Sequence, residues 1–168
     1  PGFPFFGPPD WTHSNAVIHN LVDDTIMFSA RHQDAVVKFS RATGEIIWIL
    51  GPHANWGPAF QQYLLTPVGT PFEFQFHEHA PMVTPAGTIL LFDNGNYRAS
   101  PFDGNVKLEP EQSYSRAVEF AIDEETMEVR QVWEYRYDLA MFQFAPTQGD
   151  ADWMPITGNV LITSTDTR

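Results

Sequence analysis

The residues best suited to chemistry in this sequence are five that lie beside short, β-rich runs. They are His13, Arg31, His32, His77 and His79. An imidazole can serve as a nucleophile, an acid or a base near neutral pH, and a guanidinium binds oxyanions through a rigid fork of donors. The chain has 9 Lys+Arg against 21 Asp+Glu and a net charge of −12, so these few basic groups indicate a site for a small anionic substrate.

Each histidine also has a structural interpretation, because partly buried imidazoles commonly act as hydrogen-bonding residues. Residues 74–79 alternate like a strand, which predicts that His77 and His79 share one face and that Glu78 lies on the other. Taken alone, this cluster could instead bind a metal ion, although we predict no metal site. Residues 93–96, Asp-Asn-Gly-Asn, predict a turn.

The composition of the 168 residues argues against several other classes of protein. The strongly acidic balance repels phosphate backbones, so nucleic acid is not an expected partner. The absence of cysteine removes a thiol nucleophile, a thiolate metal site and any disulfide. No apolar run approaches the roughly 20 residues that span a bilayer, so we expect no membrane partner. Hydrophobic residues at 43 % and aromatic residues at 14 % favour a folded, β-rich chain.

The elements that must position these residues recur along the chain. Three short β-rich runs are versions of one another, at residues 24–28, 87–92 and 158–163. Each is preceded, eight or nine residues before its first residue, by a polar residue followed by alanine, at 15–16, 79–80 and 150–151. Such internal similarity at intervals of several tens of residues is typical of repeat architectures.

Two of the repeats share a second half that reads as a β-hairpin. The first hairpin joins 36–39 to 46–49, and the second joins 117–120 to 129–133. Four antiparallel strands in each repeat, with a Trp in the last, form the pattern of a propeller blade. The alternative interpretation is a β-sandwich whose strands resemble one another by chance.

These repeats predict an all-β fold, a β-propeller of which this chain covers about two blades and the start of a third. The predicted parts are a blade at about 10–51, an inter-blade insertion at about 52–73, a blade at about 74–137 and the start of the next blade at about 149–168. Closed propellers have about four to eight blades, so residues 1–168 are expected to be a fragment of a single propeller domain.

A propeller places its inner strands around a central channel, and the residues at the mouths of those strands converge on one point. The polar residues that precede the inner strands, among them His13, Asn15 and His79, are therefore candidate site residues. With 24–28 taken as the inner strand of the first blade, we expect Arg31 at the other end of that strand or in the turn that follows it.

A series of motifs in fixed order adds a second line of argument. They are Asp-Trp-x-His-x-Asn at 10–15, Ser-Ala-Arg-His-Gln at 29–33, Trp-Ile-Leu-Gly at 48–51, His-Ala-Pro-Met at 79–82, Leu-Phe-Asp-Asn-Gly-Asn-Tyr-Arg at 91–98 and Tyr-Ser-Arg-Ala-Val-Glu at 114–119. Their order and spacing resemble the central blades of bacterial arylsulfate sulfotransferases. The likeness runs from about Asp10 to Tyr135 and resumes over 150–163.

The resemblance implies a six-bladed propeller that is usually exported to the periplasm and that uses no nucleotide sulfate donor. Such an enzyme takes the sulfuryl group from an aryl sulfate and passes it to a phenol, in a ping-pong reaction through a sulfohistidine. By motif, the nucleophile is His79, and His13 and Arg31 are the other catalytic residues of this chain. Asn15 is implied as a supporting substrate ligand.

Three further residues near these motifs are candidate substrate-binding residues, namely His32, Asn94 and Tyr97. The resemblance implies an aryl sulfate and a phenol as small-molecule partners, no metal or organic cofactor, a homodimer of the full-length protein and a periplasmic or secreted location. It also implies one more site histidine in an earlier blade outside this chain, which leaves the activity of this piece alone in question.

Two other functions remain open at this point. A quinoprotein dehydrogenase also has blades with Ala-Thr-Gly-Glu before a Trp strand, as at 42–45 and Trp48, but its calcium–quinone site needs converging carboxylates. A non-enzymatic propeller that binds a partner on its face explains the fold without explaining His13, Arg31 and His79 together. Sulfuryl transfer that needs neither calcium nor quinone distinguishes the three functions.

Overall fold

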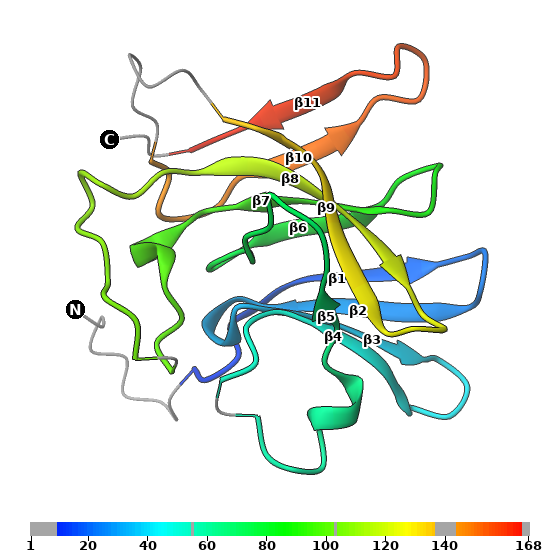
Figure 1. Cartoon of the computed structure of the whole chain (residues 1–168). Helices are drawn as coiled ribbons and strands as arrows, with labels where there is room; N and C mark the ends of the chain where they lie inside the picture. Colours follow the sequence, from blue (N-terminus) through cyan, green and yellow to red (C-terminus); the bar gives the residue numbers. More distant parts are fainter. Residues whose placement is uncertain (1–9, 55, 103, 137–143, 166–168) are drawn as a thin grey trace.

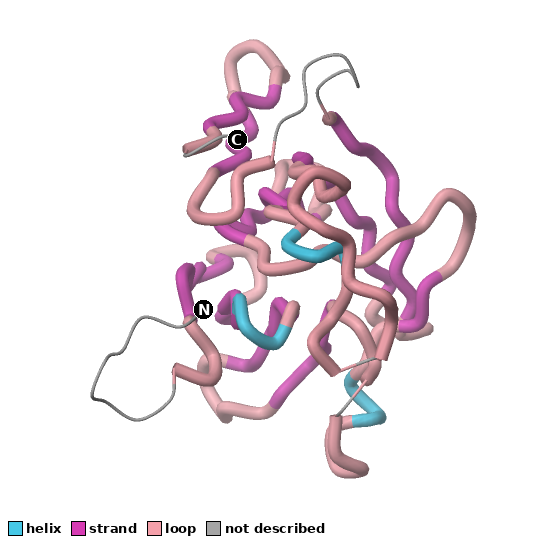
Figure 2. Tube along the Cα trace, turned by 90° about the vertical axis from the view of Figure 1, so that its left-hand side faces the viewer, coloured by secondary structure: helices cyan, strands magenta, loops and turns pink. Residues whose placement is uncertain are grey.

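The computed structural model describes residues 10–54, 56–102, 104–136 and 144–165, and over these residues the chain is all-β (Figure 1). The strands are β1 (Ser14–Asn20), β2 (Thr25–Ala30), β3 (Ala35–Ser40), β4 (Ile46–Leu50), β5 (Thr66–Pro67), β6 (His79–Val83), β7 (Ile89–Asp93), β8 (Arg116–Asp123), β9 (Glu128–Tyr135), β10 (Asp150–Trp153) and β11 (Val160–Thr163). Three short 3-10 helices are η1 (Arg31–Gln33), η2 (Gln61–Tyr63) and η3 (Asn96–Arg98), and Figure 2 shows how little of the chain they occupy. No helix in the described ranges is long and apolar enough to cross a membrane.

The strands form three sheets that follow one another in chain order. The first sheet has the order β1-β2-β3-β4, the second β5-β9-β8-β7-β6 and the third β10-β11. Neighbouring strands are antiparallel, apart from the parallel pair β5 and β9. Edge strands of successive sheets contact one another, β1 against β6 and β6 against β10. Figure 1 shows this succession from the blue and cyan sheet through the green and yellow sheet to the orange and red one.

Both hairpins predicted from the sequence are confirmed. Residues 36–39 and 46–49 lie in β3 and β4, and residues 117–120 and 129–133 lie in β8 and β9. The first hairpin turn closes through Gly44, whose amide donates to the Ser40 carbonyl over 2.8 Å at a φ of +75°. That backbone conformation strains any residue with a Cβ, which explains the glycine.

The three similar β-rich runs lie in β2, β7 and β11, each paired with an edge strand, β1, β6 or β10. A further strand precedes each of them and begins close to the polar residue and alanine. In the antiparallel pair of β1 and β2, Ser14 lies opposite Ala30, so the end of β2 returns to the start of β1. Arg31 therefore lies in the turn after β2, as expected, and this turn is at the same end of the sheet as His13.

Residues 52–73 connect the first two sheets and also contribute to the second. The chain leaves β4 and returns beside it, where the Leu65 amide donates to the Ile49 carbonyl over 3.0 Å. It then forms β5, in which Thr66 pairs with Glu128 of β9. The segment was expected only as an insertion between blades, and it adds an edge strand that ties the outer strands of the two sheets together.

The main core lies between the first and second sheets. Its fully buried residues are Met27, Val36, Trp48, Leu50, Leu65, Ile89, Leu91, Val118, Phe120 and Val129. The intervening side chains of β7, Leu90 and Phe92, face the other way and pack on Ala151 of the third sheet. Each large apolar side chain buried in this way stabilises the fold by roughly 1.5–3 kcal/mol. β7 is a continuous apolar run because it is buried on both faces. This burial holds in place the strand that leads to Asn94.

The strand predicted over 74–79 is wrong, because β6 begins only at His79 and the φ of His77 is +56°. Here the backbone amides donate hydrogen bonds to side chains instead of to a neighbouring strand. The Phe76 amide donates to Asp93 Oδ1 over 2.9 Å, and the His77 amide donates to Asp34 Oδ1 over 2.7 Å. Such side-chain acceptors compete with a β ladder and release the chain from strict alternation.

Candidate active site

The candidate catalytic residues gather at one end of the first two sheets. His13 and Arg31 flank the paired ends of β1 and β2, and His79 opens β6, with its partner Phe92 near the end of β7. Since β6 lies beside β1, this register brings the three functional side chains to one end of the molecule. The structure thus brings together the residues predicted from the sequence, from segments up to 66 positions apart.

The His79 side chain is held by a fixed hydrogen-bond network. Its Nδ1 lies 2.6 Å from Asn94 Oδ1, and the Asn94 amide nitrogen donates to the Ala145 and Gln148 carbonyls over 2.7 and 2.6 Å. Two carbonyl acceptors on the nitrogen fix the orientation of the Asn94 amide, so its oxygen faces His79. His79 must then carry its proton on Nδ1, which leaves the lone pair of Nε2 available.

The surroundings of His79 also favour its neutral form. Burial lowers the pKa of His79, the hydrogen bond to Asn94 opposes that effect, and the charges of Arg31 and His13 lower the pKa further. A neutral imidazole with an unshared Nε2 lone pair is the form that can act as a nucleophile.

Arg31 is anchored by the segment that follows the second sheet. Its Nη2 donates to the Pro146 carbonyl over 2.8 Å, one residue from the carbonyl of Ala145 that holds Asn94. Burial lowers the pKa of Arg31, and the negative charges of Asp34 and Asp10, with that of Glu78 where it is ionised, oppose that effect. A guanidinium remains charged under these conditions and can bind an oxyanion. The role of residues 145–148 as hydrogen-bond acceptors was not predicted, because backbone carbonyls carry no sequence signal.

His13 is held by Asp10 and not by an amide. Asp10 Oδ1 accepts the His13 backbone amide over 2.8 Å, and Asp10 Oδ2 lies 2.5 Å from His13 Nδ1. The hydrogen bond to His13 is the main reason that the pKa of the Asp10 carboxyl is lowered. This contact was not predicted from the sequence, although a carboxylate three residues before a histidine has a spacing that permits it.

Asn15 and Asn94, both predicted to bind substrate, use their amides to hold the site together. The Asn15 amide nitrogen donates over 2.7 Å to the carbonyl of Glu78, the residue before His79. Asn94 is fully buried, and its side chain is occupied by His79 and by the 145–148 segment. Asn94 therefore positions His79 directly, and Asn15 holds the residue before it.

His32 and Tyr97 lie along a row of rings that crosses from the first sheet to the second. His32 lies 4.7 Å from His13 and 6.4 Å from His77, and His77 lies 6.3 Å from Tyr97, measured between ring centroids. Tyr97 is 41 % exposed and has a φ of +61°, a conformation that is uncommon for a bulky residue. The row gives the site an aromatic border on which a phenol ring could pack.

The neighbouring residues His77, Glu78 and His79 do not form a metal cluster. Their side chains take separate partners: His77 approaches Asp34, and Glu78 accepts from Ser29. In the described part of the chain, one group has ligand atoms all within 4.8 Å of one another, and it consists of Asp10, His13 and His32. His13 already hydrogen-bonds the Asp10 carboxylate and His32 the Asp10 backbone carbonyl, and the absence of a metal from the site stays a prediction.

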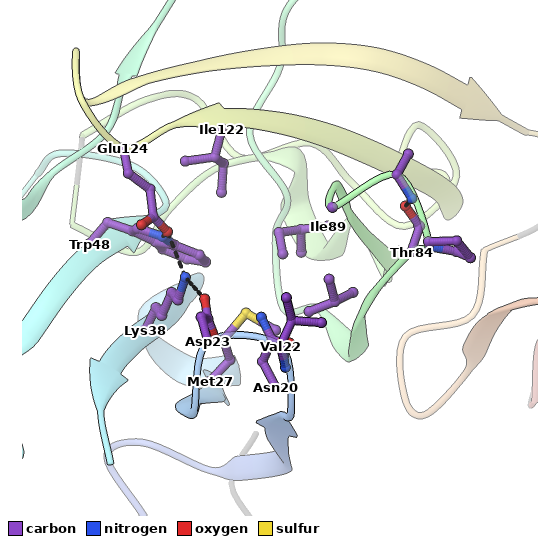
Figure 3. A pocket seen from close by; sticks show the side chains of 14 residues that line it. Asn20, Val22, Asp23, Met27, Lys38, Trp48, Thr84, Ile89, Ile122 and Glu124 are labelled. Atoms are coloured by element: carbon purple, nitrogen blue, oxygen red, sulfur yellow. Dashed lines mark hydrogen bonds and ion pairs between the residues drawn. The ribbon is translucent and has the colours of Figure 1, made fainter. Parts of the chain in front are cut away.

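A separate cavity of about 490 Å³ lies at the opposite end of the two sheets (Figure 3). Lys38 crosses its wall and pairs with Asp23 and Glu124, each over 2.6 Å, and the Trp48 indole donates to the same Glu124 oxygen over 2.8 Å. The two carboxylates neutralise the lysine, so this cavity has no free cation for an anionic substrate. Lys38 of β3 therefore links the two sheets.

A neutral imidazole beside a guanidinium, with a second imidazole held by a carboxylate, defines a candidate site for group transfer from an anionic substrate. The family model described as Arylsulfotransferase (ASST) matches residues 6–168, so the chain belongs to the arylsulfotransferase family. The arylsulfate sulfotransferase AssT of Escherichia coli O6:H1 (strain CFT073) is 36 % identical over 153 residues, which cover 82 % of this chain and 25 % of that protein. The arylsulfate sulfotransferase AssT of Lelliottia amnigena is 32 % identical, with the same coverage. The chain thus spans about a quarter of the length of these curated relatives.

Proposed function

We propose that the protein transfers a sulfuryl group from an aryl sulfate ester to a phenolic acceptor, with His79 as the nucleophile. The observation that carries this proposal is the contact between His79 Nδ1 and Asn94 Oδ1, at 2.6 Å. It leaves Nε2 unprotonated and directed away from its anchor. The names of the two relatives support the same reaction class.

The proposed reaction has two half-reactions that share one intermediate. First, His79 Nε2 forms a bond to sulfur while the bond between sulfur and the aryl oxygen breaks and the phenol leaves. Then the oxygen of a second phenol attacks the sulfur, and the nitrogen–sulfur bond breaks. Splitting one transfer into two steps in this way is nucleophilic catalysis, and it requires ping-pong kinetics.

The other groups of the site stabilise the charges that this reaction creates. Attack through Nε2 leaves positive charge on the His79 ring, and the Asn94 oxygen accepts the Nδ1–H that carries part of it. By analogy with phosphoryl transfer, most of the catalysis comes from positioning and from charge stabilisation at the sulfuryl oxygens. Arg31 supplies the fixed positive charge for those oxygens. His13 donates to the same oxygens or exchanges a proton with the phenol.

We further propose that the three sheets are consecutive parts of a β-propeller whose channel mouth is the site. Support comes from the sequence repeat and from the side-by-side edge strands β1, β6 and β10. A periplasmic or secreted location, and a homodimer of the natural protein, stay predictions.

The natural full-length protein, mixed with 4-nitrophenyl sulfate and a phenol acceptor without nucleotide, tests the proposal. We expect release of nitrophenol that is lost in His79→Ala and retained in His19→Gln. His19 is a suitable control because it is an exposed histidine at the far end of β1, where it pairs with Asp24 over 2.8 Å. Equal activity of His79→Ala and wild type would refute the assignment of the nucleophile.

A further inference from the structure

The two imidazoles of the site have partners of different charge. His79 Nδ1 meets a neutral amide oxygen of Asn94 at 2.6 Å, whereas His13 Nδ1 meets a carboxylate oxygen of Asp10 at 2.5 Å. A hydrogen bond from Nδ1–H to a carboxylate is charge-assisted and stronger than one to a neutral amide oxygen. The two imidazoles of one site are therefore held by different kinds of partner.

Asp10 binds the Nδ1 edge of the His13 ring and also binds His32, whose ring packs against the face of His13. Its two carboxylate oxygens take the backbone amide and Nδ1 of His13, over 2.8 and 2.5 Å. Its backbone carbonyl accepts His32 Nδ1 over 2.7 Å, and the His32 ring packs against His13 with a centroid distance of 4.7 Å and an interplanar angle of 30°. One residue thus fixes both the Nδ1 edge of His13 and the ring that lies against its face.

We propose that Asp10 is a positioning residue that makes His13 the acid–base group of the reaction, an inference that rests on the proposed sulfuryl transfer. With Nδ1–H bound to the carboxylate, His13 can exchange a proton only through Nε2. The carboxylate also stabilises the imidazolium that forms when His13 takes up a proton. The lowered pKa of the Asp10 carboxyl, which is caused first by its hydrogen bond to His13, agrees with an ionised partner.

The proton balance of both half-reactions closes through His13. In the first, His79 Nε2 bonds to sulfur, the bond from sulfur to the aryl oxygen breaks, and the leaving oxygen takes the Nε2 proton of His13. In the second, the acceptor phenol returns a proton to His13 Nε2 as its oxygen attacks the sulfur, and His79 leaves as a neutral imidazole. His13 ends the cycle as it began, and no co-reactant is required.

Donor sulfates with different leaving groups separate this role from a structural one. Phenyl sulfate releases a weakly acidic phenol that needs a proton, whereas 4-nitrophenyl sulfate releases a stable phenolate that needs little help. General acid catalysis contributes about 10²–10⁴-fold to a rate, and losing its orienting group removes part of that factor. In single-turnover reactions of the natural protein, we expect Asp10→Asn to slow adduct formation on His79 at least about tenfold more with phenyl sulfate than with 4-nitrophenyl sulfate.

Three further variants complete the test. Asp10→Glu should restore part of the rate with phenyl sulfate, because it restores the carboxylate. Asp10→Asn should have little additional effect in a His13→Gln background, because it acts through His13. The matched control is Asp24→Asn, which removes a carboxylate from an imidazole–carboxylate pair outside the site and should change both donor rates by the same factor.

The results that would refute the role of Asp10 differ from those that would refute the proposed sulfuryl transfer. A wild-type protein that forms no adduct on His79 overturns the proposed sulfuryl transfer. A wild type that forms the adduct, with an Asp10→Asn variant equally slow or equally fast with both donors, overturns the role of Asp10 alone. Full additivity of Asp10→Asn and His13→Gln does the same.

Discussion

Replacing Glu78 with glutamine is expected to stabilise the protein at alkaline pH and to change its stability little at acid pH. Glu78 is fully buried beside the candidate nucleophile, and its Oε1 accepts from Ser29 Oγ over 2.9 Å while Oε2 has no partner. Burial raises the pKa of Glu78 to about 8, and the charge of the nearby Asp34 adds to the effect. The buried acid is therefore neutral at pH 7.

The magnitude follows from the two states of the chain. The unfolded chain releases this proton near the ordinary value of 4.5, whereas the folded protein keeps it up to about pH 8. The interval between these values corresponds to at most about 5 kcal/mol, at 1.36 kcal/mol for each pH unit. Because the folded-state pKa is raised, this stabilisation is complete below pH 4.5, declines as the pH rises and is lost at about pH 8.

Thermal unfolding of the natural protein at pH 5, 7 and 9 measures this effect in wild type and in Glu78→Gln. The amide stays neutral throughout, so the melting temperature of the variant should exceed that of wild type by several degrees at pH 9 and nearly equal it at pH 5. The other charged groups that act on Glu78, namely Arg31, Asp34 and Asp93, are present in both proteins and cancel in the comparison. A difference in melting temperature that is the same at pH 5 and pH 9 would refute the reasoning.

Two further substitutions test the anchors of the site. Asn94→Asp places a carboxylate against His79 Nδ1 in place of the amide, and should raise the lowered pKa of His79; the acid limb of the kcat/KM profile should then move to higher pH, and an unmoved limb contradicts the assigned tautomer. Gly95→Ala should lower the melting temperature markedly, because Gly95 has a φ of +71° and an added Cβ would lie 2.0 Å from the Tyr114 carbonyl oxygen; a melting temperature within a degree of wild type contradicts this.

The sequence predicts the local elements of this fold well and its side-chain partners poorly. The hairpins of β3 with β4 and of β8 with β9 follow from short-range alternation and turn residues, which act within a few positions. The strand predicted over 74–79 fails because Asp34 and Asp93, distant in sequence, capture the backbone amides of this segment. Alternation of side chains in the sequence indicates a strand, but it contains no information about hydrogen-bond acceptors that residues of other sheets supply.

The site was predictable in its reactive groups but not in what orients them. His13, Arg31 and His79 were identified by residue type and by motif. The role of Asn94 depends on the carbonyls of Ala145 and Gln148, which lie more than 50 positions away and would be the same in any sequence. Arg31 lies in the turn where it was expected, but strand β1 was not predicted, and this extra antiparallel strand brings His13 to the same end of the sheet as Arg31.

The central claim is that His79 carries the sulfuryl group between donor and acceptor. The most direct measurement is mass spectrometry of the natural protein after brief reaction with 4-nitrophenyl sulfate in the absence of an acceptor. We predict one added sulfuryl group on the peptide that contains His79, and we expect added phenol to remove it. An adduct on another residue, or full transfer to phenol by a protein that never carries the group, would contradict it.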